Sequence, residues 1–177
     1  MTINFRDTPA TTSVDGAIQY EGVDVVSYNA TGIVYAPKNF PAFAGRLGTI
    51  QNNAATLNKV KLTGLEFNTL FCWDEINNRF IPNVAGYYYV TGSISAWGGN
   101  GLCAIIYKNG TSYLSGNWFN GVGQLYSKNY TAQVNGIVYL NGTTDYIELW
   151  GSHSASLSYS EWTLWTPGAT FRVCRVF

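Results

Sequence analysis

Residues 102–115 read LCAIIYKNGTSYLS, and this stretch decides the fold class. Asn109-Gly110 separates two short runs that carry the apolar residues of the stretch. An Asn-Gly pair supplies the two positive φ angles of a type I′ turn, which joins neighbouring antiparallel strands through two residues. The stretch therefore predicts a β-hairpin, and Asn141-Gly142 repeats the signal just before the run DYIELW at residues 145–150.

The same kind of pattern continues along most of the chain. Runs of alternating apolar and polar residues are bounded by Gly, Asn and Thr, whereas a helical period is hard to find anywhere. About ten strands in this length are typical of two packed sheets, so we expect an all-β, ten-stranded sandwich. The expected strands are Ala42–Leu47, Lys59–Leu62, Phe67–Trp73, Arg79–Ile81, Gly86–Ala96, Leu102–Lys108, Thr111–Ser115, Ser127–Tyr139, Asp145–Trp150 and Ala169–Val176.

The segment before this sandwich is expected to form a separate small module. Residues 17–35 read as three short strands that break at Glu21-Gly22 and at residues 29–32, and three such strands bury too little apolar area to be stable alone. Two prolines in residues 36–41 favour an extended backbone, so we place the boundary at about Phe40. The predicted domains are therefore residues 1–40 and 41–177. Residues 1–16 are expected to be an extended arm with little structure of its own.

The composition excludes several classes of protein. Among 177 residues there are 10 Lys and Arg, 10 Asp and Glu and one His, so the formal net charge is zero and a basic nucleic-acid-binding protein is excluded. Charged residues make up 11% of the chain and hydrophobic residues 46%, which excludes an intrinsically disordered chain. A surface with so few charges repels its own copies weakly, so we expect identical subunits to cover part of it.

The N-terminus has no apolar core of a secretory signal, and no long apolar run occurs elsewhere. We therefore expect synthesis in a cytoplasm without membrane insertion. The three cysteines, at positions 72, 103 and 174, have no short spacing of a zinc or redox motif. We expect them to be free and mostly buried.

Catalytic chemistry is not indicated by the residues that could carry it. His153 is the only histidine and lies in a Ser-rich, turn-like segment, so we expect a solvated loop residue rather than a catalytic base. Asp145 and Glu148 look exposed and stand three positions apart on an expected strand, which places them on opposite faces and prevents them from sharing a proton. We expect no enzymatic activity and no cofactor.

Two kinds of binding site need consideration. Asp74-Glu75 is the only adjacent acidic pair, and no Asp-x-Asp spacing follows, so the side chains do not predict a calcium site. Glu161 near Trp162 and Trp165 is typical of a carbohydrate-binding cluster, in which rings stack on a sugar and an acid binds its hydroxyl groups. The alternative is that the two tryptophans only cap the sandwich.

Four motifs occur in an order that is not generic: FIPNVAGYYYV at residues 80–90, YKNG at 107–110, DYIEL at 145–149 and TF at 170–171. Their order and spacing resemble the globular head of complement 1q, a relative of the tumour necrosis factor (TNF) jelly roll. The resemblance covers residues 42–177. Departures are Val90, where an aromatic residue is typical, Thr144, where glycine is usual, and the absence of a collagen-like stalk.

The resemblance implies a jelly roll that assembles as a homotrimer, with aromatic residues of three copies stacked around the threefold axis. Tyr87, Tyr88 and Tyr89 stand in consecutive positions, so they place aromatic rings on both faces of one strand. We expect these three tyrosines and Phe171 of the closing strand to form the trimer interface. For Tyr88 the alternative is a ring whose hydroxyl group only meets water.

The short β-rich segment in place of the collagen stalk looks like the modules that precede such heads in bacteriophage fibre and virion proteins. The resemblance implies a non-enzymatic virion structural protein: a homotrimeric capsid decoration, cement or head-fibre protein on the virion surface. Residues 1–40 would anchor it to the major capsid protein or other virion proteins, with the jelly roll facing outward. The alternative is a tail-fibre tip that recognises a host surface glycan. A calcium site built from backbone carbonyls at the threefold axis is a further alternative.

Overall fold

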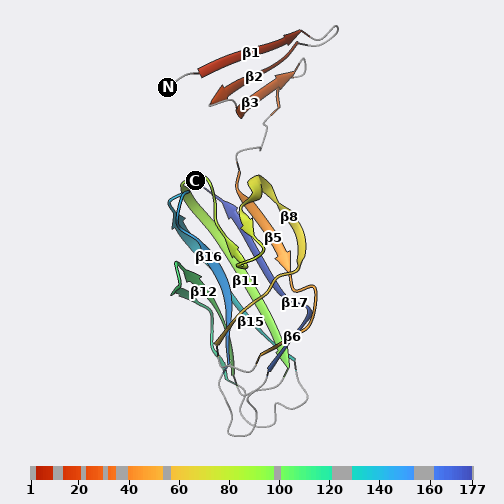
Figure 1. Cartoon of the computed structure of the whole chain (residues 1–177), viewed down its shortest axis with the longest axis vertical. Helices are drawn as coiled ribbons and strands as arrows, with labels where there is room; N and C mark the ends of the chain where they lie inside the picture. Colours follow the sequence, from red (N-terminus) through yellow and green to blue (C-terminus); the bar gives the residue numbers. More distant parts are fainter. Residues whose placement is uncertain are drawn as a thin grey trace. The chain divides into compact units, whose positions relative to one another are not determined.

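The computed structural model describes residues 3–9, 14–20, 23–29, 32–34, 40–53, 57–97, 101–120, 129–153 and 162–176. The chain divides into two compact units, Met1–Phe40 and Pro41–Phe177, each with its own sheets (Figure 1). No helix in the described part of the chain has the length and hydropathy needed to span a bilayer.

The N-terminal unit is a four-stranded antiparallel sheet whose strands follow in chain order: β1 (Ile3–Pro9), β2 (Val14–Tyr20), β3 (Val23–Asn29) and β4 (Gly32–Val34). The expectation that residues 1–16 form an unstructured arm is wrong for β1, which pairs with β2 along all of its seven residues. The physical reason is alternation: Ile3 and Phe5 alternate with polar residues and stand opposite Tyr20 and Ile18, so the strand adds apolar residues to the same rows of the sheet.

The second unit, called the head below, is a sandwich of two antiparallel sheets. The seven-stranded sheet has the order β13-β12-β16-β10-β9, with β14 beside β12 and β7 beside β16. Its strands are β7 (Leu57–Lys59), β9 (Trp73–Asp74), β10 (Arg79–Phe80), β12 (Gly101–Lys108), β13 (Thr111–Ser115), β14 (Phe119–Asn120) and β16 (Ile147–His153).

The six-stranded sheet has the order β15-β11-β17-β5-β8, with β6 beside β17. Its strands are β5 (Ala42–Arg46), β6 (Gln51–Asn53), β8 (Gly64–Asn68), β11 (Gly86–Trp97), β15 (Asn129–Leu140) and β17 (Trp162–Arg175). The two sheets confirm the predicted all-β jelly-roll sandwich.

The described part of the head has three more strands than the ten expected. Two of them, β6 and β14, were not predicted, since runs of three and two residues carry no alternation to detect. The third arises because the predicted strand Phe67–Trp73 is interrupted by a 3-10 turn over Thr69–Phe71. Leu70 and Phe71 have φ angles of 56° and 52° there, which end the extended conformation.

The two Asn-Gly turns differ. Asn109 and Gly110 both have positive φ angles, 51° and 78°, as a type I′ hairpin requires. At the second pair only Gly142 has a positive φ angle, and the Asn141 side chain instead organises the turn. Its Oδ1 accepts hydrogen bonds from the backbone N–H groups of Thr143, Thr144 and Asp145. The second turn is therefore an Asx-type turn and not a repeat of the first.

The core lies between the two sheets and is rich in aromatic rings. Phe43 of β5 stacks on Trp73 of β9 with ring centroids 4.1 Å apart, and Phe171 of β17 packs against both rings. Phe80 and Tyr88 meet edge to face, at 5.6 Å. Burial of these rings and of the surrounding aliphatic side chains supplies the main stabilisation of the head.

Candidate interaction surface

The outer face of the six-stranded sheet carries a group of exposed apolar side chains. Tyr87 and Tyr89 of β11 are 49% and 40% exposed, and Ile137 and Tyr139 of β15 are 53% and 46% exposed. They lie together because β11 and β15 are antiparallel neighbours in which Tyr87 stands opposite Tyr139 and Tyr89 opposite Ile137. The rings of Tyr87 and Tyr139 meet at 5.3 Å and 60°. We call these four residues the tyrosine patch.

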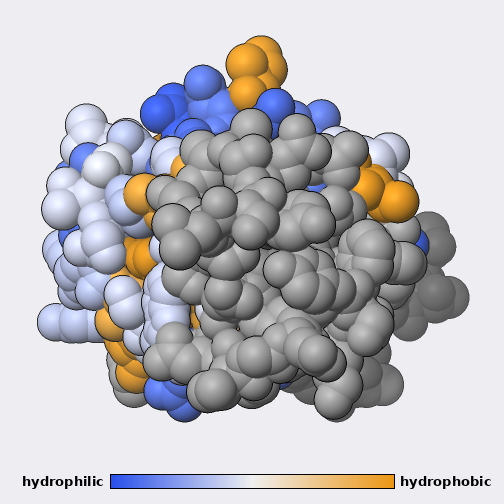
Figure 2. Space-filling model, turned by 90° about the horizontal axis from the view of Figure 1, so that it is seen from below, coloured by the Kyte–Doolittle hydropathy of each residue, from blue (hydrophilic) through white to orange (hydrophobic). Residues whose placement is uncertain are grey.

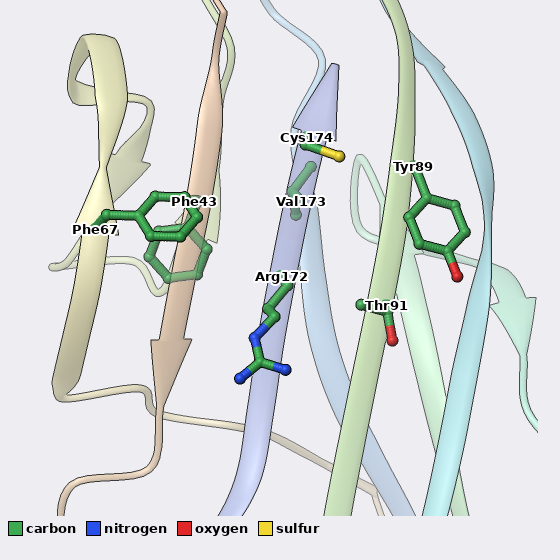
Figure 3. A pocket seen from close by; sticks show the side chains of 7 residues that line it. All are labelled: Phe43, Phe67, Tyr89, Thr91, Arg172, Val173 and Cys174. Carbon is green, nitrogen blue, oxygen red and sulfur yellow. The ribbon is translucent and has the colours of Figure 1, made fainter. Parts of the chain in front are cut away.

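A shallow hollow of about 260 Å³ lies on the same face, across β11 from the tyrosine patch. Phe67 of β8 lies on one side of it and Tyr89 of β11 on the other, with Arg172 and Cys174 of β17 between them (Figure 3). Phe43, Thr91 and Val173 complete the lining. Tyr89 thus belongs both to the patch and to the hollow, so the two features form one continuous surface.

This face carries few charges. At the outward positions of β11, β15 and the described part of β17, Arg172 is the only charged residue, and its guanidinium lies 3.7 Å from the Glu66 carboxylate. Several hydroxyl groups of the face already bond to one another: Ser93 with Thr170 at 2.8 Å, and Ser95 with Thr131 at 2.7 Å. A face of this kind loses little hydration free energy when another surface covers it.

Other described parts of the surface also expose hydrophobic side chains, and Phe71 is 95% exposed. Seen from below, hydrophobic atoms gather in several separate groups among hydrophilic ones (Figure 2). Ile76, for example, is 92% exposed in the turn between β9 and β10, where its neighbours Glu75 and Asn77 are polar and exposed. Single exposed apolar side chains are common on soluble proteins, whereas a contiguous group such as the tyrosine patch indicates an interaction site.

The prediction that Tyr88 and Phe171 lie at the trimer interface is wrong, because both side chains are fully buried inside one copy of the head. Successive residues of a strand face opposite sides, so Tyr88 points into the core while Tyr87 and Tyr89 point outward. Tyr88 Oη donates a hydrogen bond to the Val84 carbonyl at 2.5 Å, and burial raises the pKa of Tyr88 to about 12. The alternative of a hydroxyl group bound only to water is excluded as well.

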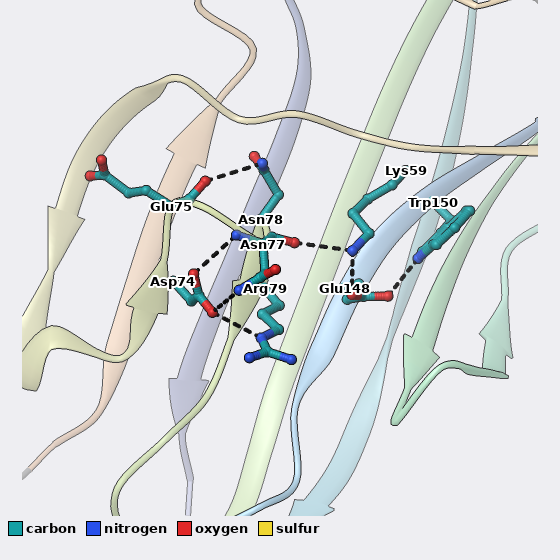
Figure 4. A network of polar contacts seen from close by, with 8 residues as sticks. All are labelled: Lys59, Asp74, Glu75, Asn77, Asn78, Arg79, Glu148 and Trp150. Atoms are coloured by element: carbon teal, nitrogen blue, oxygen red, sulfur yellow. Dashed lines mark hydrogen bonds and ion pairs between the residues drawn. The ribbon is translucent and has the colours of Figure 1, made fainter.

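The outward side of the seven-stranded sheet carries a polar network (Figure 4). Glu148 of β16 is 4% exposed, which corrects its expected exposure. Its Oε1 lies 2.5 Å from Lys59 Nζ, and its Oε2 accepts a hydrogen bond from Trp150 Nε1 at 2.8 Å. Tyr107 stacks on the Trp150 ring with centroids 4.7 Å apart. Both carboxylate oxygens thus have structural partners, and the side chain is buried.

Asp145, two residues before the start of β16, also has structural partners. Hydrogen bonding from Asn109 lowers the pKa of Asp145, and Lys108 Nζ, at 3.0 Å, adds to this effect against the opposing influence of burial. The expectation that His153 is a solvated loop residue is wrong, because it closes β16 and is 3% exposed. Burial lowers the pKa of His153.

Asp74 and Glu75 form no metal site in the described structure. Burial alone would raise the pKa of Asp74, but hydrogen bonds from Asn77 and the Arg79 guanidinium outweigh it and lower the pKa. Arg79 Nε lies 3.0 Å from Asp74 Oδ2 (Figure 4). Among the described residues, no group of three or more His, Cys, Asp or Glu side chains gathers to hold a metal ion.

The predicted glycan-binding cluster is only partly within the described residues. Glu161 lies outside them. Trp162 and Trp165 belong to the first part of β17, where Trp162 pairs with Asn53 of β6. This site stays a prediction.

Ile137, Tyr139 and Phe67 were not predicted from the sequence as surface residues. A usable signal was present, because Ile137 and Tyr139 alternate with Val138 in the same way that Tyr87 and Tyr89 alternate with Tyr88. Matching the two alternations predicts one shared outward face, provided that the two strands pair. That pairing joins segments about 50 residues apart, and their sequence does not reveal it.

No family model and no curated protein matches the chain. Solved structures match the head. The globular domain of zebrafish complement 1qA has a TM-score of 0.61 at 13% identity and covers 77% of this chain and 97% of its own. Eiger TNF from S. frugiperda has a TM-score of 0.62 at 9% identity, covering 78% and 94%. Murine APRIL at pH 5.0 has a TM-score of 0.58 at 8% identity, covering 77% and 99%. The head therefore has the jelly-roll fold of complement 1q and TNF.

Proposed function

We propose that the chain is a non-enzymatic structural protein whose head assembles as a homotrimer through the outer face of the six-stranded sheet. The tyrosine patch is the observation that carries this proposal. Three tyrosine rings and one isoleucine lie side by side on β11 and β15, whose described outward positions carry no charged residue, and water is a poor environment for such a surface. The zero net charge and the small number of charged residues also favour self-association, because copies of the chain repel one another only weakly.

The two features of this face suit a cyclic arrangement. The tyrosine patch lies on β11 and β15, and the hollow lies between β8 and β11. In a cyclic trimer each copy presents one surface to one neighbour and a different surface to the other neighbour. The β15 side and the β8 side of this continuous face would provide those two surfaces, with Tyr89 of β11 between them.

The finer role that we propose is decoration of a bacteriophage virion, with the N-terminal unit docked to the major capsid protein. The edges of that unit support it: among the described strands, β1 and β4 each pair with one neighbour only, which leaves an edge where a strand of another protein could pair. The resemblance of this segment to the modules that precede such jelly-roll heads in bacteriophage proteins supports a bacteriophage origin. The proposed location is the virion surface.

A tail-fibre tip that binds a host surface glycan is the second candidate. The tryptophans at positions 162 and 165 favour it, because aromatic rings stack on sugars. Glycan-array binding by the purified protein, lost on Trp165→Ala, would support the tail-fibre role over decoration.

Light scattering on the purified chain at micromolar concentration tests the trimer. We expect a particle of three 19.5 kDa chains. Ile137→Arg places a charge in the tyrosine patch and should give a monomer, because an unpaired charge in an apolar interface is costly. Ile76→Arg is the matched control, since it makes the same change at a position that is 92% exposed on the β9–β10 turn, and it should stay trimeric.

A monomeric wild-type chain would refute the trimer, whereas an Ile137→Arg chain that stays trimeric would refute the placement of its interface at the tyrosine patch. The docking role needs a separate test. Deletion of residues 1–40 should leave a folded trimeric head, because the head has its own core, but this head should no longer bind purified particles. Full occupancy of particles by the truncated head would contradict the anchor assignment.

A further inference from the structure

The sheet of the N-terminal unit has one apolar face and one polar face. The register places Ile3 opposite Tyr20 and Phe5 opposite Ile18, and Ile18 also stands opposite Val26. Residues of one cross-strand row share a face, and every second row lies on the same face. The rows that share this face contain Ile3, Phe5, Asp7, Pro9, Val14, Gly16, Ile18, Tyr20, Val23, Val26, Tyr28 and Ile33.

The rows between them are mainly polar, with Ala17 and Val34 as the apolar exceptions. They contain Asn4, Arg6, Thr8, Asp15, Ala17, Gln19, Asp24, Ser27, Asn29, Gly32 and Val34. Asp7 is the only charged residue on the first face within the four described strands, and it stands at the turn end of β1. The segregation is therefore nearly complete, although a bulge in β3 interrupts the alternation once.

A single four-stranded sheet with one apolar face needs a second layer to cover that face, because domains bury their apolar faces between layers. The N-terminal unit contains no second layer among its described residues. Three strands of seven residues and one of three, at about 4.8 Å spacing and about 3.4 Å rise, give a face on the order of 400 Å². A standard protein interface buries about 800 Å² per partner, so this face is too small to hold a partner tightly by itself.

A small face associates well only when another contact already holds the partners together. The chain provides that contact, because seven residues separate Val34 at the end of β4 from Ala42 at the start of β5. Such a segment spans at most about 28 Å. In a trimer of heads, three N-terminal sheets would thus be confined near one another, at a local concentration in the millimolar range.

We propose that the apolar faces of three N-terminal sheets pack against one another around the axis of the assembly, so that the second layer of each sheet comes from the other copies. This proposal rests on the proposed trimer of heads and names a second self-association site within it. The polar faces and the strand edges then remain outside, where the edges are free to pair with another protein.

Cross-linking in the full-length chain tests this packing. Ile18→Cys places a thiol in the middle of the apolar face, and Ala17→Cys places one at the adjacent position on the polar face. Both are made in a Cys174→Ser background, which removes the exposed native thiol. A bis-maleimide that spans about 10 Å, the spacing of packed sheets, should join copies of the Ile18→Cys chain into covalent oligomers and leave the Ala17→Cys chain single.

Amide hydrogen exchange of residues 3–34 in the wild-type chain supplies a second readout, which needs no introduced cysteine. We expect exchange at least about tenfold slower than in Ile18→Asp, which opens the packed faces. Ala17→Asp should keep the slow exchange. Light scattering on each sample separates the two proposals: a trimeric wild-type chain with a rapidly exchanging N-terminal sheet overturns the packed faces and leaves the head trimer intact.

Two further results would also overturn the packed faces. Equal cross-linking of the Ile18→Cys and Ala17→Cys chains would show that the copies meet without a preferred face. Slow exchange that develops only after addition of virus particles would mean that a different protein covers the apolar face. A monomeric wild-type chain, in contrast, would refute the head trimer on which the packing depends.

Discussion

The ion pair between Lys59 and Glu148 allows a quantitative prediction about the head. The Glu148 side chain is 6% exposed and the Lys59 side chain 29% exposed. Lys59→Met removes the ammonium group and leaves the buried carboxylate with Trp150 Nε1 as its remaining side-chain donor. Removal of one partner from a fully buried pair costs about 3–5 kcal/mol. Because water reaches Lys59, we expect a smaller loss of about 2–3 kcal/mol in the free energy of unfolding.

Urea denaturation at fixed protein concentration measures this loss, and the fixed concentration removes the effect of subunit association. The double variant Lys59→Met/Glu148→Gln should recover part of the stability, because a neutral amide no longer needs the ammonium group and its oxygen still accepts the Trp150 hydrogen bond. Arg79→Met is the control, since the pair between Arg79 and Asp74 is 30% and 23% exposed and should cost only about 1 kcal/mol or less.

Two results would refute this reasoning. A loss below about 0.5 kcal/mol for Lys59→Met would mean that water solvates Glu148 in spite of its burial. A double variant that is less stable than Lys59→Met would mean that the carboxylate is needed for Trp150 rather than for the ion pair.

Three further predictions concern single side chains of the head. Tyr88→Phe removes the donor to the Val84 carbonyl and should cost about 1 kcal/mol in urea denaturation. Burial lowers the pKa of His153, so the unfolded chain binds its proton more readily; the free energy of unfolding should fall by up to about 1.4 kcal/mol per pH unit below the usual pKa of 6.5, and His153→Gln should remove this slope. Thiol labelling should find Cys174 reactive in the monomeric Ile137→Arg chain and Cys72 unreactive until unfolding, because burial raises the pKa of Cys72 to about 12.

The sequence predicts the local features of this fold well. The Asn109-Gly110 hairpin and the long strand at Gly86–Trp97 are encoded within a few residues, by turn chemistry and by alternation. Where a side chain takes over the turn, as at Asn141, the same dipeptide gives a different geometry. Pattern alone does not distinguish these two cases, because the backbone N–H groups that donate to the Asn141 side chain lie outside the dipeptide.

The sequence predicts the interaction surface only in part. Three consecutive tyrosines indicate rings on both faces of a strand, but the face that meets the core depends on the second sheet. Tyr88 is buried because Phe80, in a different sheet, packs against its ring. Burial of Glu148 likewise depends on Lys59, which is 89 positions away in the chain. Such contacts depend on which distant strands pair and pack against one another. Local patterns in a single sequence do not specify that arrangement.

The apolar face of the N-terminal sheet and the outer face of the head together explain how the chain could self-associate, which neither face explains alone. A chain with zero net charge and few charges needs its apolar surface covered; the head exposes the tyrosine patch, and the register of the N-terminal sheet places apolar residues together on one face. The face of the N-terminal sheet is too small to associate by itself, and the head face is interrupted by Arg172 and its Glu66 partner. Because a short segment joins the units, association at one face raises the local concentration of the other. A change at either face should therefore weaken the whole assembly more than the area of that face alone implies, and Ile18→Asp should make the head trimer dissociate more readily on dilution.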